Sequence, residues 1–320
     1  KQASGMLTTG DLVAFVGLIG LLYGPVHALA NMNDLLARSL TAAARVLEVF
    51  DTLPEVTESP DVVPRFDLKG EVEMRDLSFG YEKYQTVFKC LNVHIRPGET
   101  IGLIGKSGIG KSTLIKLLVR LYGASGGSVF LDGLNIRRIM NADIRRNIGV
   151  VMQDPFLFKG TVAENILLAQ PDATLRSVAE AAKVANAHGF IMRLPDAYDT
   201  QLRERGTRLS GGERQRIAIA RALVTNPKIM IFDEATSNLD AETEWQIQNA
   251  LHKTFAGRTT VLISHRLSTL RLAKRIMVLD EKGLREFGSF EELLAEEGDW
   301  LQLLGKSAGS VNPEAPEKVP

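Results

Sequence analysis

The fold of this chain is decided by the stretch Gly105-Lys106-Ser107-Gly108-Ile109-Gly110-Lys111-Ser112-Thr113. An apolar run at 100–104 precedes it, and the spacing of Leu114, Leu117, Leu118 and Leu121 predicts one face of a following helix. Strand, glycine-rich turn and helix, in this order, are the context in which G-x-x-x-x-G-K-[ST] forms a phosphate-binding loop. The glycines permit positive φ angles and let backbone N–H groups approach phosphate oxygens. The stretch therefore predicts a site for a nucleoside triphosphate.

Two side chains of this loop have expected roles. Lys111 is predicted to reach the β- and γ-phosphates, and the Ser112 hydroxyl is predicted to bind Mg²⁺. The N-terminus of the following helix adds unsatisfied N–H groups and partial positive charge for an anion. The expected fold class is α/β, with a P-loop core.

Composition sets wide bounds on the class of protein. The chain has 320 residues, enough for one large domain or two smaller ones, and 45% of them are hydrophobic, enough for a core. Its 38 basic residues balance 38 acidic ones, so it lacks an overall electrostatic footprint for nucleic acid, and we expect no nucleic-acid partner. The single cysteine, Cys90, excludes an intrachain disulfide and indicates a reducing compartment. Because the sequence starts at Lys1 without Met, we expect a fragment or a processed product.

Residues 12–30 form an apolar run with no charged residue apart from the titratable His27. Its nineteen residues approach the length needed to cross a bilayer, and residues 8–11 offer capping side chains. A signal peptide is excluded because the run is too long and no small-residue cleavage site follows. A buried helix of a soluble protein stays open as an alternative. His27 either lines a transport path or packs near the end of the span.

A helical pattern continues beyond this run. Apolar residues at 32, 35, 36, 40, 43, 46, 47 and 50 form one stripe, so we expect the helix to leave the bilayer and continue in water against a partner helix. Pro54, Pro60 and Pro64, with acidic residues between them, indicate a linker over 51–65.

The composition changes near Phe66 to short runs that predict strands. These are 72–79, 87–95, 129–133, 148–153, 229–232, 259–264 and a strand pair within 276–287. Thr161 and Glu164 have capping-box spacing, and the helical stretch that follows to 194 is interpreted as an inserted subdomain. A short helix to 304 and a disordered tail over 305–320 complete the prediction.

The stretch 209–216 opens a further predicted helix. Ser210 and Glu213 form a capping box, which by itself is a structural role. Gly211 and Gly212 weaken the helix by about 1 kcal/mol each relative to alanine. Such a cost is understandable if a ligand approaches the bare backbone, so a second phosphate-contacting surface is favoured here.

Polar residues follow two apolar strands. Asp233 and Glu234 end the run at 229–232, and two adjacent carboxylates there are expensive unless they serve a cation or a water. Asp233 suits the Mg²⁺ of a phosphate-loop enzyme, and Glu234 suits the activation of an attacking water. His265, at the tip of the next strand, is expected to share this site.

Taken together, these motifs resemble those of the ATP-binding cassette (ABC) transporters over 66–304. The matching elements are the loop 105–113, Gln153, the Leu-Ser-Gly-Gly-Glu signature at 209–213, Asp233-Glu234, residues 237–240 and His265, with Tyr81 at the place of the adenine-stacking aromatic. The resemblance implies a RecA-like P-loop core with an antiparallel β subdomain and an inserted α-helical subdomain.

The exporter branch is the closer resemblance, because 200–206 is similar to the loop by which exporters sense coupling helices. Residues 1–50 then look like the last membrane helix of a half-transporter and its cytoplasmic extension. The implied partners are the other membrane helices, membrane lipid, an unknown substrate and a second copy or homologous half-transporter, head-to-tail across two ATP molecules. The implied location is a membrane, as a multi-pass protein with the ATP-binding domain in the cytoplasm, in a bacterial plasma membrane.

Site roles carried over from the family have ATP and Mg²⁺ as cofactors. The expected residues are Lys111, Glu234 and His265 for catalysis; Tyr81, Gly105, Lys106, Ser107, Gly108, Ile109, Gly110, Lys111, Ser112, Thr113 and Gln153 for ATP; Ser112, Gln153 and Asp233 for Mg²⁺; and Ser210, Gly211, Gly212, Glu213 and Asp240 for the partner's ATP.

Departures from the family pattern are small. Glu213 replaces the commoner Gln, Asn238 replaces the commoner Ala, and 200–206 keeps only its Thr and its final Glu-Arg-Gly. None removes a catalytic group, so hydrolysis is expected. The alternatives are a soluble ABC ATPase acting on nucleic acid and a non-hydrolysing, membrane-tethered fragment.

Overall fold

A computed structural model describes residues 8–52, 56–64, 66–81, 86–202, 209–235, 241–280 and 283–295. The chain divides into two compact units, Lys1–Glu55 and Val56–Pro320. The predicted short helix beyond 295 and the predicted disordered tail lie outside the described residues.

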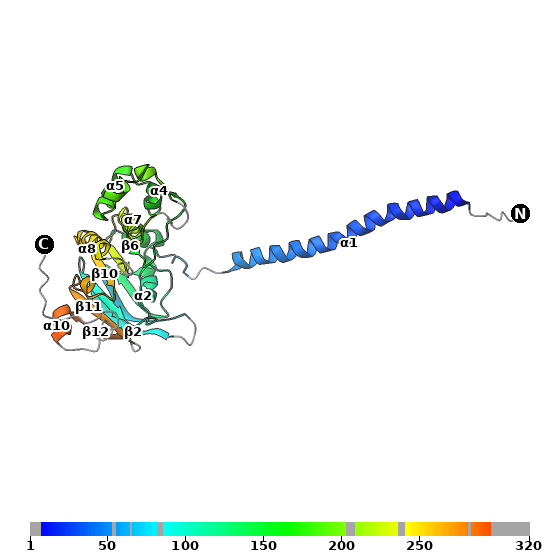
Figure 1. The fold of residues 1–320 in the computed structure, drawn as a ribbon. Coiled ribbons are helices and arrows are strands. Elements are labelled where there is room, and N and C mark those ends of the chain that lie inside the picture. Colours follow the sequence, from blue (N-terminus) through cyan, green and yellow to red (C-terminus); the bar gives the residue numbers. More distant parts are fainter. Residues whose placement is uncertain are drawn as a thin grey trace. The chain divides into compact units, whose positions relative to one another are not determined.

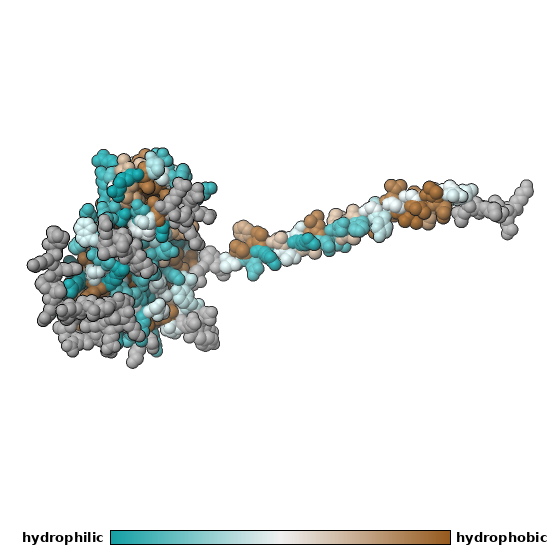
Figure 2. All heavy atoms as spheres, viewed as in Figure 1, coloured by the Kyte–Doolittle hydropathy of each residue, from teal (hydrophilic) through white to brown (hydrophobic). Residues whose placement is uncertain are grey.

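The first unit contains one long helix, α1 (Thr9–Asp51). Thr8 caps it with a capping box that includes Asp11, and the helix continues without a break past residue 30, as expected. In the described part of the chain, this helix is long and apolar enough to cross a membrane by length and composition. Figure 2 shows hydrophobic residues gathered towards its N-terminal end and hydrophilic residues farther along.

The second unit is built on a six-stranded sheet in the order β12-β11-β3-β10-β9-β6 (Figure 1). Its strands are β3 (Thr100–Gly105), β6 (Ile148–Val151), β9 (Ile229–Asp233), β10 (Thr259–Ile263), β11 (Arg275–Asp280) and β12 (Gly283–Ser289). All neighbours are parallel except β11 and β12. Every residue of β3, β9 and β10 is buried, as expected for parallel strands covered on both faces.

A second, four-stranded antiparallel sheet has the order β2-β1-β4-β5. Its strands are β1 (Val72–Gly80), β2 (Thr86–Ile95), β4 (Gly126–Leu131) and β5 (Leu134–Asn135). Burial alternates along much of β2, so one face packs on the core. One apolar cluster joins this sheet to the first through residues such as Phe88, Leu103 and Leu131. The antiparallel subdomain that the resemblance implied is therefore present.

The helices are α2 (Lys111–Leu118), α3 (Asn141–Asn147), α4 (Val162–Leu167), α5 (Leu175–Val184), α6 (His188–Ile191), α7 (Gly211–Leu223), α8 (Ala241–Phe255), α9 (Leu267–Leu270) and α10 (Phe290–Ala295), with 3₁₀ turns η1 (Ile136–Arg138) and η2 (Ala197–Asp199) and a small pair β7 (Gly160–Thr161) and β8 (Gln201–Leu202). Helices α4 and α5 pack on α7, which packs against β6 (Figure 1). The inserted helical subdomain is therefore present, as three short helices rather than one stretch.

The prediction for Leu121 is wrong. Helix α2 ends at Leu118, and Arg120 takes a left-handed backbone with φ 53°. Leu121 consequently leaves the helix and is 49% exposed. Several strand ends differ too: β6 stops at Val151, two residues before Gln153.

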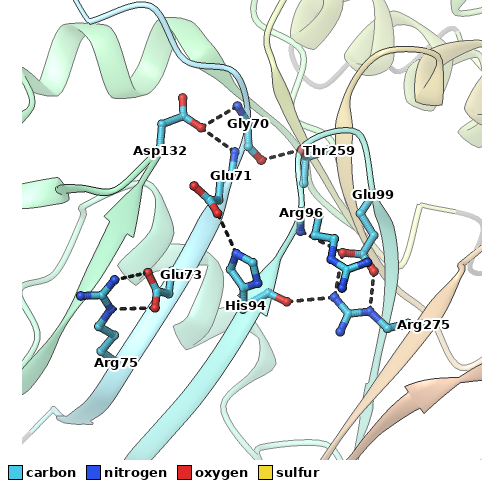
Figure 3. A network of polar contacts seen from close by, with 10 residues as sticks. All are labelled: Gly70, Glu71, Glu73, Arg75, His94, Arg96, Glu99, Asp132, Thr259 and Arg275. Carbon is cyan, nitrogen blue, oxygen red and sulfur yellow. Dashed lines mark hydrogen bonds and ion pairs between the residues drawn. The ribbon is translucent and has the colours of Figure 1, made fainter.

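Polar contacts join the two sheets at the amino ends of β3, β10 and β11 (Figure 3). Glu99 pairs with Arg275, which also donates to the His94 carbonyl at 2.9 Å. The Thr259 hydroxyl donates to the Gly70 carbonyl at 2.6 Å and accepts from the Gly98 N–H at 2.9 Å.

The segment that leads into β1 is held by a carboxylate. Asp132 accepts from the N–H groups of Lys69, Gly70 and Glu71. The Asp132 contacts thus hold the start of β1 against the end of β4 within the antiparallel sheet, whereas the contacts of Thr259 and Arg275 bind that sheet to the core.

Candidate active site

The strand order brings the predicted site residues to one edge of the six-stranded sheet. The phosphate loop follows β3, Asp233 ends β9, His265 follows β10, and Gln153 follows β6. These four strands are mutually parallel, so their carboxyl ends share an edge. Ligands of open α/β sheets bind at such an edge.

The loop depends on glycine at Gly110. Its φ is 111°, a left-handed conformation that strains other residues, and a Cβ there would lie 2.5 Å from Val87 and 2.9 Å from Phe88. Gly110 ends the loop and directly precedes α2. The absence of a side chain at Gly110 therefore permits the backbone turn that ends the loop and orients the N-terminus of α2.

Lys111 is folded back into this loop. Its Nζ donates to the carbonyls of Gly105 at 2.6 Å and Lys106 at 3.0 Å, and the residue is only 8% exposed. Burial lowers its pKa, although the nearby carboxylates of Glu234 and Asp233 act in the opposite direction. A buried ammonium next to a nest of N–H groups is suited to meet phosphate.

Asp233 is a buried carboxylate with a raised pKa. Burial is the main cause and Glu234 adds to it, whereas the Ser112 hydroxyl and Lys111 act against it. The Ser112 hydroxyl donates to Asp233 Oδ2 across 3.4 Å. Hydroxyl and carboxylate oxygens are ligands that Mg²⁺ prefers, and the negative charge of Asp233 is not fully balanced by its neighbours. The Ser112–Asp233 pair therefore fits this ion.

Glu234 and His265 face each other, with Glu234 Oε1 3.3 Å from His265 Nε2. Glu234 has a left-handed backbone with φ 48°, and its N–H donates to the Ile263 carbonyl at 2.9 Å. A positive φ at a non-glycine residue is strained and is often found at functional sites. The turn after β9 thus aims the carboxylate at the strand that carries the histidine.

Tyr81 lies just after β1 and is 41% exposed. Its hydroxyl is 3.0 Å from the Thr113 hydroxyl, and its ring meets the Phe79 and Tyr122 rings edge-on. Sequence reasoning missed Lys116, whose Nζ lies 5.5 Å from the centre of the Tyr81 ring. No local signal could reveal it, because the two residues come from separate elements.

Ser210 and Glu213 make the predicted capping box at the start of α7. The Glu213 N–H donates to Ser210 Oγ at 3.2 Å, and the Ser210 N–H donates to Glu213 Oε2 at 2.8 Å. Gly211 is exposed in this turn, whereas Gly212 is buried. Asp240, with the rest of 237–240, and residues 203–206 of the predicted sensing loop lie outside the described residues.

The structure thus brings Lys111, Ser112, Asp233, Glu234 and His265 together. Gln153 is exposed at the same edge, and within the described residues no hydrogen bond joins it to Ser112 or Asp233. Its predicted metal and ATP roles, like those of the other site residues, stay predictions.

Comparison with protein families matches residues 88–237 to the family described as ABC transporter. Protein YgaD of Bacillus subtilis, named as a candidate multidrug export ATP-binding/permease protein, is 43% identical over 301 residues, 94% of this chain and 52% of the relative. The ATP-dependent lipid A-core flippase of Syntrophus aciditrophicus is 42% identical over 299 residues, 93% of this chain and 50% of the relative.

A solved structure, a bacterial Atm1-family ABC exporter with ATP bound, matches with a TM-score of 0.80 and 36% identity over 95% of this chain and 54% of that chain. The chain spans about half the length of the curated relatives it matches.

Proposed function

The chain belongs to the ABC transporter family through its ATP-binding domain, and from this premise we propose that it hydrolyses ATP to drive export across a membrane. In this proposal α1 is a membrane helix of an exporter with further membrane helices, and the second unit works in the cytoplasm of a bacterium. The transported substrate is left unspecified, because its contacts would lie among those membrane helices.

The observation that carries the proposal is the contact of 3.3 Å between Glu234 Oε1 and His265 Nε2, beside the phosphate loop. Glu234 is assigned as the general base that takes a proton from the attacking water. His265 is assigned to hold that carboxylate and to donate towards the γ-phosphate. Lys111 neutralises the phosphate charge that develops as the bond to the leaving ADP breaks.

Mg²⁺ would be held by Ser112 and Asp233, with Gln153 as a further candidate, and when bound it neutralises negative charge on the β- and γ-phosphates. Proton transfer from the attacking water and the positioning of the phosphates are assigned to Glu234, His265 and Lys111. Burial of Lys111 and Asp233 keeps water from competing with the phosphate and the metal for these groups.

The assembled form in this proposal is a head-to-tail dimer with a second copy or a homologous half-transporter. Ser210 to Glu213, at the exposed start of α7, would then meet the γ-phosphate held by the partner subunit. The two ATP sites would close together, and closure would move the membrane helices between two states.

The test is Glu234→Gln in the assembled transporter. Gln keeps the shape of the side chain but cannot accept the proton, so ATP turnover should fall by at least about 100-fold while ATP binding remains. Steady-state phosphate release and nucleotide binding are measured on the same preparation. Full turnover in this variant rejects the assigned base, and binding without turnover in the parent protein supports a non-hydrolysing fragment instead.

A further inference from the structure

His265 lies in a short turn between β10 and α9. Ser264, only 4% exposed, directly follows this strand, and its hydroxyl accepts from the Arg266 N–H at 3.0 Å. The direction of the histidine ring therefore depends on how the residues on its carboxyl side, Arg266 to Ser268, are held. The strand alone fixes only the amino side of the turn.

A single carboxylate, Glu244 on α8, holds that side of the turn. It forms an ion pair with Arg266 and accepts from the Ser268 hydroxyl at 3.1 Å. The Gln248 side chain donates to the same Glu244 oxygen as Ser268, at 3.2 Å. The Glu244 side chain is 18% exposed, so solvent screens the ion pair less than a surface one.

The helix that carries Glu244 is itself anchored. Arg216 of α7 donates to the Gln246 side chain at 2.8 Å, two residues after Glu244. Arg216 is buried, and its guanidinium stacks 5.0 Å from the centre of the Phe190 ring. The first turns of α8 therefore provide a fixed support between the signature helix α7 and the histidine turn.

We propose that Glu244 is a positioning residue for His265, an inference that rests on the proposed ATP hydrolysis. By binding the first and third residues after the histidine, it keeps Nε2 near Glu234. Without its charge the turn from Arg266 to Ser268 is free to shift, and a displacement of about 1 Å at a reacting group can cost about 100-fold in rate.

The test is a double-mutant cycle of Glu244→Gln and His265→Ala, with the protein assembled in lipid nanodiscs. Glu244→Gln alone should lower kcat about tenfold and leave KM for ATP within about twofold, because ATP contacts are untouched. In the His265→Ala background the same change should cost less than about twofold, since residues acting as a unit are not additive. Single-turnover release of labelled phosphate measures the slow variants.

The matched control is Glu180→Gln, which removes an equal charge from an exposed ion pair with Arg176 on α5. It should leave kcat within about twofold. If Glu244→Gln does not fold, Ser268→Ala replaces it, with a smaller loss of about threefold expected from one hydrogen bond.

Equal losses with and without His265, or unchanged turnover in Glu244→Gln, overturn the inference while the parent protein still turns over ATP. A parent protein without ATP turnover rejects the proposed function and this inference together.

Discussion

Charged side chains at the two edges of the six-stranded sheet differ in how completely they are paired. At the amino edge, Glu99 is 8% exposed and fully engaged by Arg275 and the Arg96 N–H. At the carboxyl edge, Ser112 meets Asp233 across 3.4 Å and Glu234 meets His265 across 3.3 Å. Contacts at the first edge are complete without a ligand, whereas those at the second are long and leave charge to be compensated. The amino edge therefore stabilises the folded protein, whereas the charged groups at the carboxyl edge remain able to bind a ligand.

The carboxyl pKa values move in opposite directions at the two edges. Burial raises the pKa of Glu99, but hydrogen bonds from Arg275 and the Arg96 backbone outweigh it, so the net pKa is lowered. Burial and Glu234 together raise the pKa of Asp233. Folding therefore favours the charged form of Glu99 and disfavours the charged form of Asp233.

The largest expected effect distinguishes the buried Lys111 from the half-buried Arg275. Lys111→Met should weaken ATP binding by about 100-fold or more, because a charge-assisted phosphate contact of about 3 kcal/mol is lost. Arg275→Met, at the other edge, should leave ATP affinity nearly unchanged. Titration with a fluorescent ATP analogue measures both, and an equal loss in the two variants contradicts the division of labour.

Removal of the Glu99 charge should destabilise the protein by about 3 kcal/mol, because Arg275 is left half-buried without its partner. The variant is Glu99→Gln, and the measurement is urea unfolding without nucleotide. Glu73→Gln, which breaks an exposed ion pair with Arg75, is the matched control and should cost at most about 1 kcal/mol. A similar loss of unfolding free energy in both variants would mean that burial does not make the Glu99–Arg275 pair more important for stability than an exposed pair.

A smaller effect of opposite sign is expected for Asp233→Asn. Because folding disfavours the charged form, its removal should stabilise the nucleotide-free protein by about 1 kcal/mol. The added thermal stability that the parent gains from Mg²⁺ and ATP should be lost in the same variant. Thermal unfolding with and without both ligands tests this, and a lower midpoint in the absence of ligand is the contrary result.

The smallest effect is the pH dependence of the Glu99 contribution. A lowered pKa means that this stability is fully present above the usual glutamate value of 4.5 and is lost as pH falls through the lower folded value. The difference in unfolding free energy between the parent protein and Glu99→Gln should stay constant from neutral pH to about pH 5.5 and shrink below pH 4.5. A difference that grows on acidification contradicts the sign of the shift.

Sequence reasoning predicted the carboxyl edge much better than the amino edge. The phosphate loop, the caps of α1, α4 and α7, and the polar ends of β9 and β10 are local signals, each legible within a few residues. Glu99 and Arg275 are 176 positions apart, and Thr259 and Gly70 are 189 apart. Their pairing depends on strand order, which spacing along the chain does not encode.

Local patterns also failed at one point close to the loop. Leu121 has the spacing of the α2 face, but the left-handed backbone of Arg120 ends that pattern. A periodic pattern alone cannot show that a helix stops after eight residues, since Arg has no special preference for this conformation. Glu244 was missed for a related reason: a glutamate in a helix looks like a solvated charge until its partners on another element are known.

Helix α1 has one more consequence, which is mechanical. Its 43 residues measure about 65 Å along the axis, roughly twice the hydrocarbon thickness of a bilayer. A rod of that length is a lever: a tilt of about 5° at one end sweeps the other end through about 6 Å, the height of one helical turn. Pro25 lies within the first half of the rod and removes a backbone hydrogen bond there, which makes it the compliant joint at which such a lever would flex.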